Sequence, residues 1–203
     1  MAVTAAQGER YTIRRKVFRL LGNAFHVFNA EGEIIGFCDQ KRLRLKEDIR
    51  FYTDASKSEE LLTLKARSII DFGATYDISL PTGELIGSLR RKGMKSTFVR
   101  DEWRVFDEAG EQIGSVQEKG AIASVLRRLN DYAALLSPQK LELWRHTPEQ
   151  KPAEGTQIAT LRRHFNPFIY RLGVAVHTED EQLDDLMLLA IGCLIAAIEG
   201  RQG

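Results

Sequence analysis

Three clusters of Lys and Arg are the residues of this chain best suited to bind a ligand. The clusters are Lys41-Arg42-Leu43-Arg44-Leu45-Lys46, Arg90-Arg91-Lys92 with Lys95, and Arg162-Arg163-His164. Each follows a glycine-containing turn by a similar distance, so structurally equivalent turns would bring them to one rim of the domain. Basic side chains near an anionic surface contribute about 1 kcal/mol each to binding. The candidate residues for binding an anion or a lipid are Lys41, Arg42, Arg44, Arg90, Arg91, Lys92, Lys95, Arg162 and Arg163.

A second interpretation of these clusters needs no ligand. Charged residues at the margins of a sheet prevent strand edges from pairing with other chains and keep a domain in solution. The place equivalent to the clusters after a further turn holds Gln117-Glu118-Lys119, which breaks the pattern. Both interpretations stay open at the level of sequence.

Catalytic and metal-binding motifs are not recognisable in the sequence. His26, His146, His164 and His177 are scattered, without HxH or HExxH spacing and without a paired carboxylate. We interpret them as surface residues of strands. No nucleophile elbow, phosphate loop or dinucleotide fingerprint occurs. The sequence therefore predicts no enzyme, no catalytic residue, no metal and no cofactor, although an active site assembled from distant strands would leave no such motif.

Composition limits the classes of partner. The 29 Lys and Arg residues nearly balance the 28 Asp and Glu residues, so no net charge favours nucleic acid. Cys38 and Cys193 lie in apolar settings without CxxC spacing, which predicts buried, reduced thiols. Residues 1–10 lack the apolar run of a signal peptide. We expect a cytoplasmic protein that can lie peripherally at a membrane, with no nucleic-acid partner and no transmembrane span.

A repeated turn unit organises the chain. Gly-Glu, two further residues and Gly close a hairpin at residues 31–36, 82–87 and 109–114, and residues 155–159 are a weaker fourth copy. The turn glycine can adopt a positive φ, and the β-branched residue beyond it restarts an extended strand. A phosphate loop would need a Gly-Lys-Ser/Thr ending or a following helix, which these copies lack. The repeats therefore predict β-hairpins.

Further strand-like runs bring the number of strands to about twelve. They lie at residues 11–18, 48–53, 61–67, 97–100 leading into Trp103, 140–146 and 168–177. One short helix is predicted at 121–129, where the apolar residues fall on one face. Since no stretch resembles a linker, we expect one domain over residues 1–203.

The C-terminal region predicts a helix over residues 179–199. Thr178 and Glu181 form a capping box, and Gly200 suits the position after the last turn. Residues 186–198 are apolar on every face, whereas a surface helix has a polar face. The helix must therefore be enclosed, with Asp184 and Asp185 hydrated at the mouth of the enclosure.

Two environments could enclose this helix. The apolar run would span about 20 Å, whereas the hydrocarbon of a bilayer is about 30 Å thick. About twelve strands make a barrel roughly 24 Å across, which leaves room for a helix of about 10 Å. The preferred fold is mainly β: a closed antiparallel barrel of about twelve strands around the hydrophobic C-terminal α-helix. A membrane anchor is the alternative.

These features together resemble the superfamily of the LURP-one-related proteins, the phospholipid scramblases and the Tubby C-terminal domain. Its fold is a twelve-stranded barrel around a C-terminal helix, and the likeness covers nearly the whole chain, most of all to the compact LURP-one-related branch. It is carried by Phe28-Asn29-Ala30-Glu31-Gly32-Glu33, Ala74-Thr75-Tyr76-Asp77-Ile78, Gly83-Glu84-Leu85-Ile86-Gly87 with Leu89-Arg90-Arg91-Lys92-Gly93, Phe165-Asn166-Pro167-Phe168, and the final Ala197-Ile198-Glu199-Gly200.

The departures from these relatives restrict what the resemblance implies. The proline-rich arm, the cysteine cluster and the calcium loop of scramblases are missing, and the acidic residues 178–185 lack alternating ligands and a turn glycine. No motif matches the phosphoinositide pocket of Tubby. We expect a non-catalytic barrel that binds an anionic phospholipid, a phosphoinositide or an acidic ligand at its basic rim. The alternative is a structural or protein-interaction domain without a lipid role.

Overall fold

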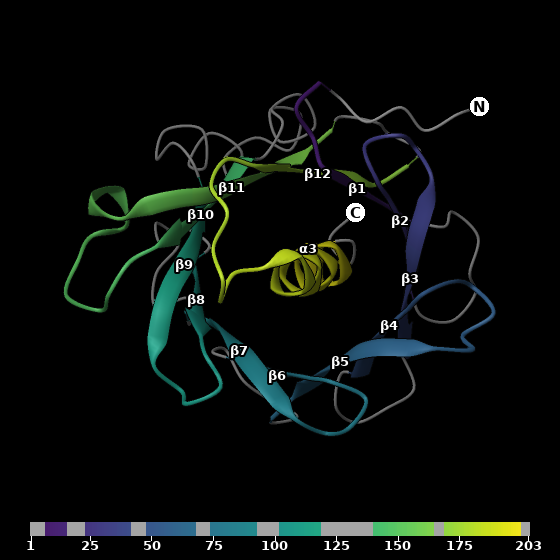
Figure 1. Ribbon diagram of the computed structural model, residues 1–203, viewed down its shortest axis with the longest axis horizontal. Helices are drawn as coiled ribbons and strands as arrows, with labels where there is room; N and C mark the ends of the chain where they lie inside the picture. Colours follow the sequence, from purple (N-terminus) through teal and green to yellow (C-terminus); the bar gives the residue numbers. More distant parts are fainter. Residues whose placement is uncertain are drawn as a thin grey trace, which may run out of the picture.

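Twelve antiparallel strands close into a barrel around one helix, which confirms the predicted fold (Figure 1). The computed structural model describes residues 7–15, 23–41, 48–67, 74–92, 102–118, 140–164 and 169–199. Each strand pairs with its neighbours in sequence, and β1 pairs with β12 to complete the circle. The elements are β1 (Tyr11–Arg15), β2 (Asn23–Phe28), β3 (Ile34–Lys41), β4 (Asp48–Tyr52), β5 (Glu60–Ala66), β6 (Thr75–Ser79), β7 (Leu85–Arg91), β8 (Glu102–Phe106), β9 (Gln112–Glu118), β10 (Lys140–Arg145), the 3-10 turn η1 (Pro152–Glu154), β11 (Thr156–Arg163), β12 (Arg171–Val176) and α3 (Asp185–Glu199).

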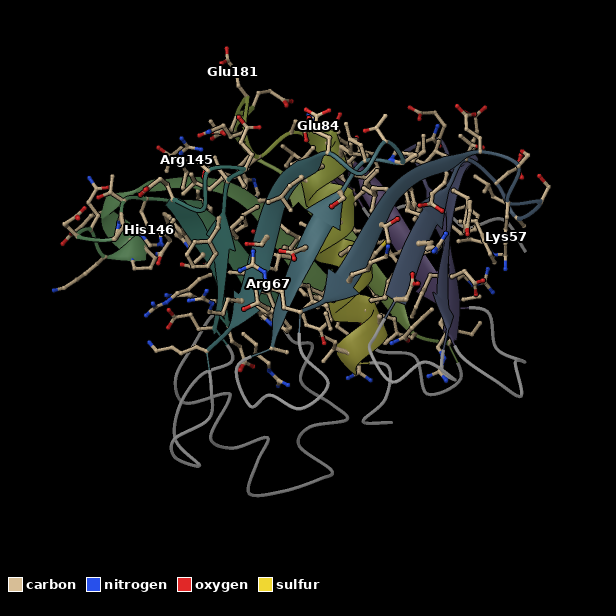
Figure 2. All side chains as sticks on the ribbon, turned by 90° about the horizontal axis from the view of Figure 1, so that it is seen from below. Lys57, Arg67, Glu84, Arg145, His146 and Glu181 are labelled. Carbon is tan, nitrogen blue, oxygen red and sulfur yellow. The ribbon has the colours of Figure 1, made fainter. Side chains whose placement is uncertain are left out.

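Because consecutive strands alternate in direction, the barrel has two distinct ends. The connections β2–β3, β4–β5, β6–β7, β8–β9 and β10–β11, and the segment from β12 to α3, all lie at one end, which we call the turn end. Helix α3 runs from the turn end to the opposite end (Figure 2). The strand-like run predicted at residues 97–100 and the short helix predicted at residues 121–129 lie outside the described residues.

The repeated turn unit forms hairpins as predicted. Gly32, Gly83 and Gly110 have φ of 83°, 91° and 83°, which side chains with a Cβ rarely adopt. The weaker fourth copy differs, because η1 precedes it and Gly155 has a φ of −89°. In that copy the glycine is required by space, since a Cβ would lie 2.0 Å from the carbonyl oxygen of Arg145.

The second glycine of the unit packs against neighbouring side chains inside the barrel. A Cβ on Gly87 would lie 2.5 Å from Cε of Met187 in α3, and one on Gly36 would lie 2.2 Å from the Phe51 ring. Contacts this short do not occur, so a larger residue would displace the helix or the ring. The spacing of the two glycines therefore serves both the turn and the packing beneath it.

Helix α3 begins at Asp185, six residues later than predicted. Asp184 caps it instead of Thr178, because the Asp184 carboxylate accepts a hydrogen bond from the Met187 amide at 2.9 Å. The carboxylate of Asp180 accepts hydrogen bonds from the amides of Gln182 and Leu183. The Thr178 amide, which the predicted capping box would use, instead donates a hydrogen bond to the carbonyl oxygen of Ile158 at 3.3 Å.

The helix is enclosed on all sides. Residues 187–197 are all buried, and eleven consecutive residues cover every face of an α-helix. Each buried Leu or Ile contributes about 1.5–3 kcal/mol relative to exposure. Asp184 and Asp185 are exposed at the turn end, as predicted. In the described part of the chain, no helix is long and apolar enough to cross a membrane.

Ion pairs connect the two ends of the sequence at the mouth of the barrel. Arg10, which precedes β1, pairs with Glu179 and with Asp185, its Nη1 atom lying 2.9 Å from Asp185 Oδ1. The hydrogen bond from Arg10 lowers the pKa of the Glu179 carboxyl. Water screens these exposed groups, so we assign the pairs to orienting the start of α3 rather than to stability.

The two cysteines are buried, as predicted, and no disulfide joins them in this structure. Cys38 lies on β3 and Cys193 on α3, so the thiols meet where the wall contacts the helix. The hydrogen bond between the two thiols, together with burial, raises the pKa of Cys38. A thiol that is protonated and buried is a poor nucleophile.

Substitution of Ile195 with Asp should unfold the protein. Ile195 is 2% exposed within the core, so the carboxylate would lose its hydration at a cost of several kcal/mol, comparable with the roughly 5–15 kcal/mol by which a domain is stable. Ile34→Asp is the matched control, because Ile34 is 54% exposed and should tolerate the change. Thermal unfolding by circular dichroism measures both. A cooperative transition for Ile195→Asp at the wild-type temperature would contradict the enclosed helix.

The thiols should react with an aromatic disulfide reagent only after unfolding. Both should react together in denaturant and neither in native buffer, because each is fully buried. Ser58→Cys supplies an exposed thiol as the control and should react at once. If Cys38 or Cys193 reacted in native buffer at the rate of that control, the wall and helix could not be packed as described.

Candidate functional site

Acidic residues are concentrated at the turn end. The six connections there, residues 29–33, 53–59, 80–84, 107–111, 146–155 and 177–184, contain 14 Asp or Glu and two Lys. Figure 2 shows two of them, Glu84 and Glu181, at this end of the barrel. Half of the acidic residues of the chain therefore lie at one end.

Basic residues predominate at the other end, which we call the basic end. We define the basic end by two sets of residues. The first set is the two residues of each strand that are farthest from the turn end, and the second is the described residues that continue the chain beyond these strand ends. Together the two sets contain 12 Lys or Arg and three Asp or Glu. The nearly neutral net charge thus conceals two oppositely charged ends. The 12 are Arg14, Arg15, Lys41, Lys65, Arg67, Arg90, Arg91, Lys92, Lys140, Arg162, Arg163 and Arg171.

Each end of the α3 dipole lies at the end of the barrel that carries the opposite charge. The N-terminus of α3 carries a partial positive charge and lies at the acidic turn end, where Asp184 and Asp185 adjoin it. Its C-terminus carries a partial negative charge and points to the basic end. The charge separation on the wall therefore stabilises the helix in the orientation observed.

The structure brings the predicted clusters to the same end but does not gather them into one pocket. Strands β3, β7 and β11, which carry the described members, are separated around the barrel by other strands. Lys41 ends β3, whereas Arg42, Arg44 and Lys95 lie outside the described residues.

Two of the predicted residues lie on the inner face of the barrel wall, although Arg163 is exposed at its end. Arg91 is opposite the buried Trp103, and its guanidinium lies 5.7 Å from the centre of that ring. Arg163 is opposite the buried Leu172, and its guanidinium lies 5.3 Å from the centre of the Tyr170 ring. Both arginines therefore lie on the inner face at the end where α3 terminates, which suits them to balance its dipole.

The outward-facing members of the second cluster already have partners. Nζ of Lys92 lies 2.8 Å from Glu102 Oε2, and Arg90 donates a hydrogen bond to Thr75 Oγ1 at 3.1 Å. The Arg90 guanidinium also lies 5.0 Å from the centre of the Phe106 ring. These contacts fix the side chains while leaving the charge of Arg90 uncompensated.

Cross-strand pairing divides the outer wall into two arcs. On β3 to β6, oppositely charged residues are paired across strands: Asp39 with Arg50, Asp48 with Lys65, and Lys65 with Asp77. Such pairs stabilise a sheet by about 0.2–1 kcal/mol each. This half of the wall is electrostatically matched.

The remaining arc pairs like charges. Arg90 is opposite Arg104, Lys140 is opposite Arg162, and Arg14 is opposite Arg171. Like charges directly opposite each other destabilise a sheet. The described residues contain no cross-strand pair of two acidic residues. This basic arc from β7 to β1 is the candidate functional surface.

Comparison with known protein families, curated proteins and solved structures finds no match to this chain. The site must therefore be interpreted from its own geometry.

A buried Ser–His pair is the arrangement closest to catalytic machinery. His146, expected at the surface, is only 7% exposed, and its Nε2 lies 2.8 Å from Oγ of Ser115. Its Nδ1 lies 2.8 Å from the carbonyl oxygen of Thr147, which can only accept, so Nδ1 carries the proton. In the tautomer with the proton on Nδ1, Nε2 of His146 accepts a hydrogen bond from the Ser115 hydroxyl.

Access decides against Ser115 as a nucleophile. A groove of about 530 Å³ adjoins His146 and includes Arg145, Gln150 and Gln182 in its lining, but Ser115 does not line it and is 1% exposed. Figure 2 shows Arg145 and His146 near each other on this side of the barrel. A nucleophile must reach the reacting atom. We interpret the pair as a buried polar contact between β9 and the segment that follows β10.

Other site chemistry finds little support in the described residues. Within them, no group of three His, Cys, Asp or Glu could hold a metal ion. His164 instead pairs with Glu9, whose carboxylate also lies 3.8 Å from Nη2 of Arg171. The expectation of no metal and no cofactor stays a prediction.

Sequence reasoning missed Arg14, Arg104, Lys140 and Arg171 as members of the basic arc. Arg104, Lys140 and Arg171 belong to no cluster of basic residues that follows a glycine turn. Arg14 belongs to the run Arg14-Arg15-Lys16, but this run does not follow a copy of the repeated turn unit, so the pattern used for the other members did not find it. Their proximity depends on strand register, which places residues far apart in sequence directly opposite each other.

Ser115→Ala should lower stability without altering the outer surface. It would leave buried Nε2 of His146 without its donor, at a cost of about 1–3 kcal/mol. The melting temperature should fall by roughly 2–10 °C for a domain of this size. Ser58→Ala, at an exposed turn position, is the control and should have no effect. Equal melting temperatures for the two variants would show that the contact does not stabilise the fold.

Proposed function

We propose that this protein is a non-catalytic module that binds anionic phospholipid surfaces through the basic end of its barrel. The observation that carries the proposal is the separation of charge: the strand ends and adjoining residues at this end hold 12 basic and three acidic residues, with Glu199 of α3 as a fourth acidic residue, whereas the connections at the other end hold 14 acidic and two basic residues. A surface with one sign of charge attracts the opposite sign even when the molecule as a whole is nearly neutral.

The distance between the two ends makes this separation effective. Strands of five to eight residues give the wall a height of roughly 20 Å at about 3.3 Å per residue. The Debye length at physiological ionic strength is about 8 Å, so an anionic surface at the basic end is screened from the acidic end. The barrel would therefore approach such a surface with its basic end first and with α3 pointing its C-terminus toward it.

The magnitude fits a reversible membrane contact. Four outward basic residues near the headgroups would contribute about 4 kcal/mol together. Binding of this strength depends on lipid composition and weakens as salt rises. The proposal therefore requires a peripheral association rather than insertion.

The plugged barrel also supports the proposal that the chain belongs to the superfamily of the LURP-one-related proteins, since a twelve-stranded barrel around a C-terminal helix is the fold that the resemblance implies. Fold likeness alone does not transfer lipid binding. The lipid proposal therefore rests on the charges.

Co-sedimentation with vesicles tests the function. The protein should bind phosphatidylcholine vesicles that contain phosphatidylserine, bind pure phosphatidylcholine poorly, and dissociate as sodium chloride is raised. Lys92→Glu should weaken binding by about tenfold or more, because it reverses a charge at the basic end. Arg91 is left intact, since a carboxylate beside Trp103 would disturb the core.

Lys151→Glu is the matched control. It makes the same change in net charge at an exposed position of the turn end and should leave vesicle binding unchanged. Equal losses in the two variants would mean that net charge, not the basic end, governs binding. Absence of binding by the wild-type protein would overturn the proposal and favour a structural or protein-interaction role.

A further inference from the structure

One pair in the basic arc differs from the other two. Lys140 at the start of β10 and Arg162 near the end of β11 are direct cross-strand partners, and both side chains are exposed. Opposite Cβ atoms in an antiparallel sheet are about 4.5–5.5 Å apart. Two full positive charges are therefore held side by side by the register of the sheet.

Acidic side chains lie near this pair, Glu142 two residues along β10 and Glu9 over Gly173 of β12, but neither forms an ion pair with Lys140 or Arg162 within the described residues. Arg104 has Glu102 at 3.7 Å, and Arg171 has Glu9 at 3.8 Å, whereas neither Lys140 nor Arg162 forms an ion pair there. The other like-charge pairs are thus partly compensated. Lys140 and Arg162 are not.

On the side of β12, an acidic side chain occupies the space beside Arg162. The residue opposite Arg162 on β12 is Gly173, which has no side chain. The carboxylate of Glu9 lies over Gly173, where it pairs with His164 and Arg171. The nearest acidic group on that side is therefore committed to other partners.

We infer that Lys140 and Arg162 together form the binding site for a dianionic phosphate group. The inference rests on the proposed function and names the residues and the headgroup chemistry that would carry it. The planar guanidinium of Arg can donate two parallel hydrogen bonds to phosphate oxygens, and the ammonium of Lys adds a point charge. A phosphomonoester with two negative charges would neutralise both cations, which a single carboxylate could not.

The pair predicts an unusual combination of effects for Lys140→Glu. The substitution would replace a repulsive pair with an attractive Glu–Arg pair and should raise the melting temperature by about 1–4 °C in buffer without phosphate. It should also abolish the additional stabilisation that inorganic phosphate gives the wild-type protein at constant ionic strength, with apparent affinity falling at least tenfold. Arg162→Glu should behave in the same way.

Lys151→Glu is again the control and should keep the phosphate response of the wild type. This comparison removes the general stabilisation of proteins by phosphate salts, which acts on all variants alike. A lower melting temperature for Lys140→Glu, or a phosphate response equal to that of Lys151→Glu, would overturn the inference.

Vesicles distinguish a lipid headgroup from free phosphate. Phosphatidylcholine vesicles that contain a phosphatidylinositol monophosphate should bind the wild-type protein but not the Lys140→Glu variant. If both Lys140→Glu and Arg162→Glu still bound these vesicles while Lys92→Glu did not, the membrane function would stand and the pair would be excluded as its site. If only the response to inorganic phosphate were lost and the wild type bound no vesicles, the pair would stand as a site for soluble phosphate and the membrane function would fail.

Discussion

An α-helix that is apolar on every face can be stable in water only when other parts of the chain surround it. Residues 187–197 of α3 are all buried, and the wall that buries them must close completely, since an open sheet would leave one face of the helix in solvent. Closure depends on glycines where the wall and its contents approach most closely, such as Gly87 beside Met187. The hairpin turns, the strand number and the packing of Cys193 against Cys38 all serve this enclosure.

Enclosure of the helix also orders the charges. The chain enters α3 at the turn end, so the partial positive charge of the helix is placed among acidic connections and its partial negative charge faces inward arginines such as Arg91 and Arg163. Part of the charge separation therefore has a structural cause. The outward residues of the basic arc have no such cause, because they lie on the other face of the wall.

The features that local sequence determines could be predicted, and those that depend on register could not. Turn glycines and alternating apolar residues act over a few positions, so the hairpins, the twelve strands and the buried helix followed from the sequence. The predicted start of α3 was wrong because the Thr178 amide bonds to β11 instead, and the turn at Asp180 precedes the cap at Asp184. The predicted clusters identified Arg162 but not Lys140, since only the pairing of β10 with β11 shows that the two face each other. Likewise His146 was expected at the surface, and its burial depends on Ser115 from another strand.

Two explanations of the basic residues remained open from sequence, and closure of the barrel bears on one of them. Charges that protect strand edges are needed where a sheet has edges, but β1 pairs with β12 and the closed barrel has none. The opposite-charge pairs of β3 to β6 make the surface as soluble as like-charge pairs would. They also stabilise the sheet, whereas like-charge pairs destabilise it. The basic arc carries three like-charge pairs, all of them basic. Opposite-charge pairs like those of β3 to β6 would keep the barrel equally soluble and would stabilise the sheet as well. In the proposed function, an anionic partner would supply the missing compensation, because its charge would convert the repulsion between Lys140 and Arg162 into a shared attraction.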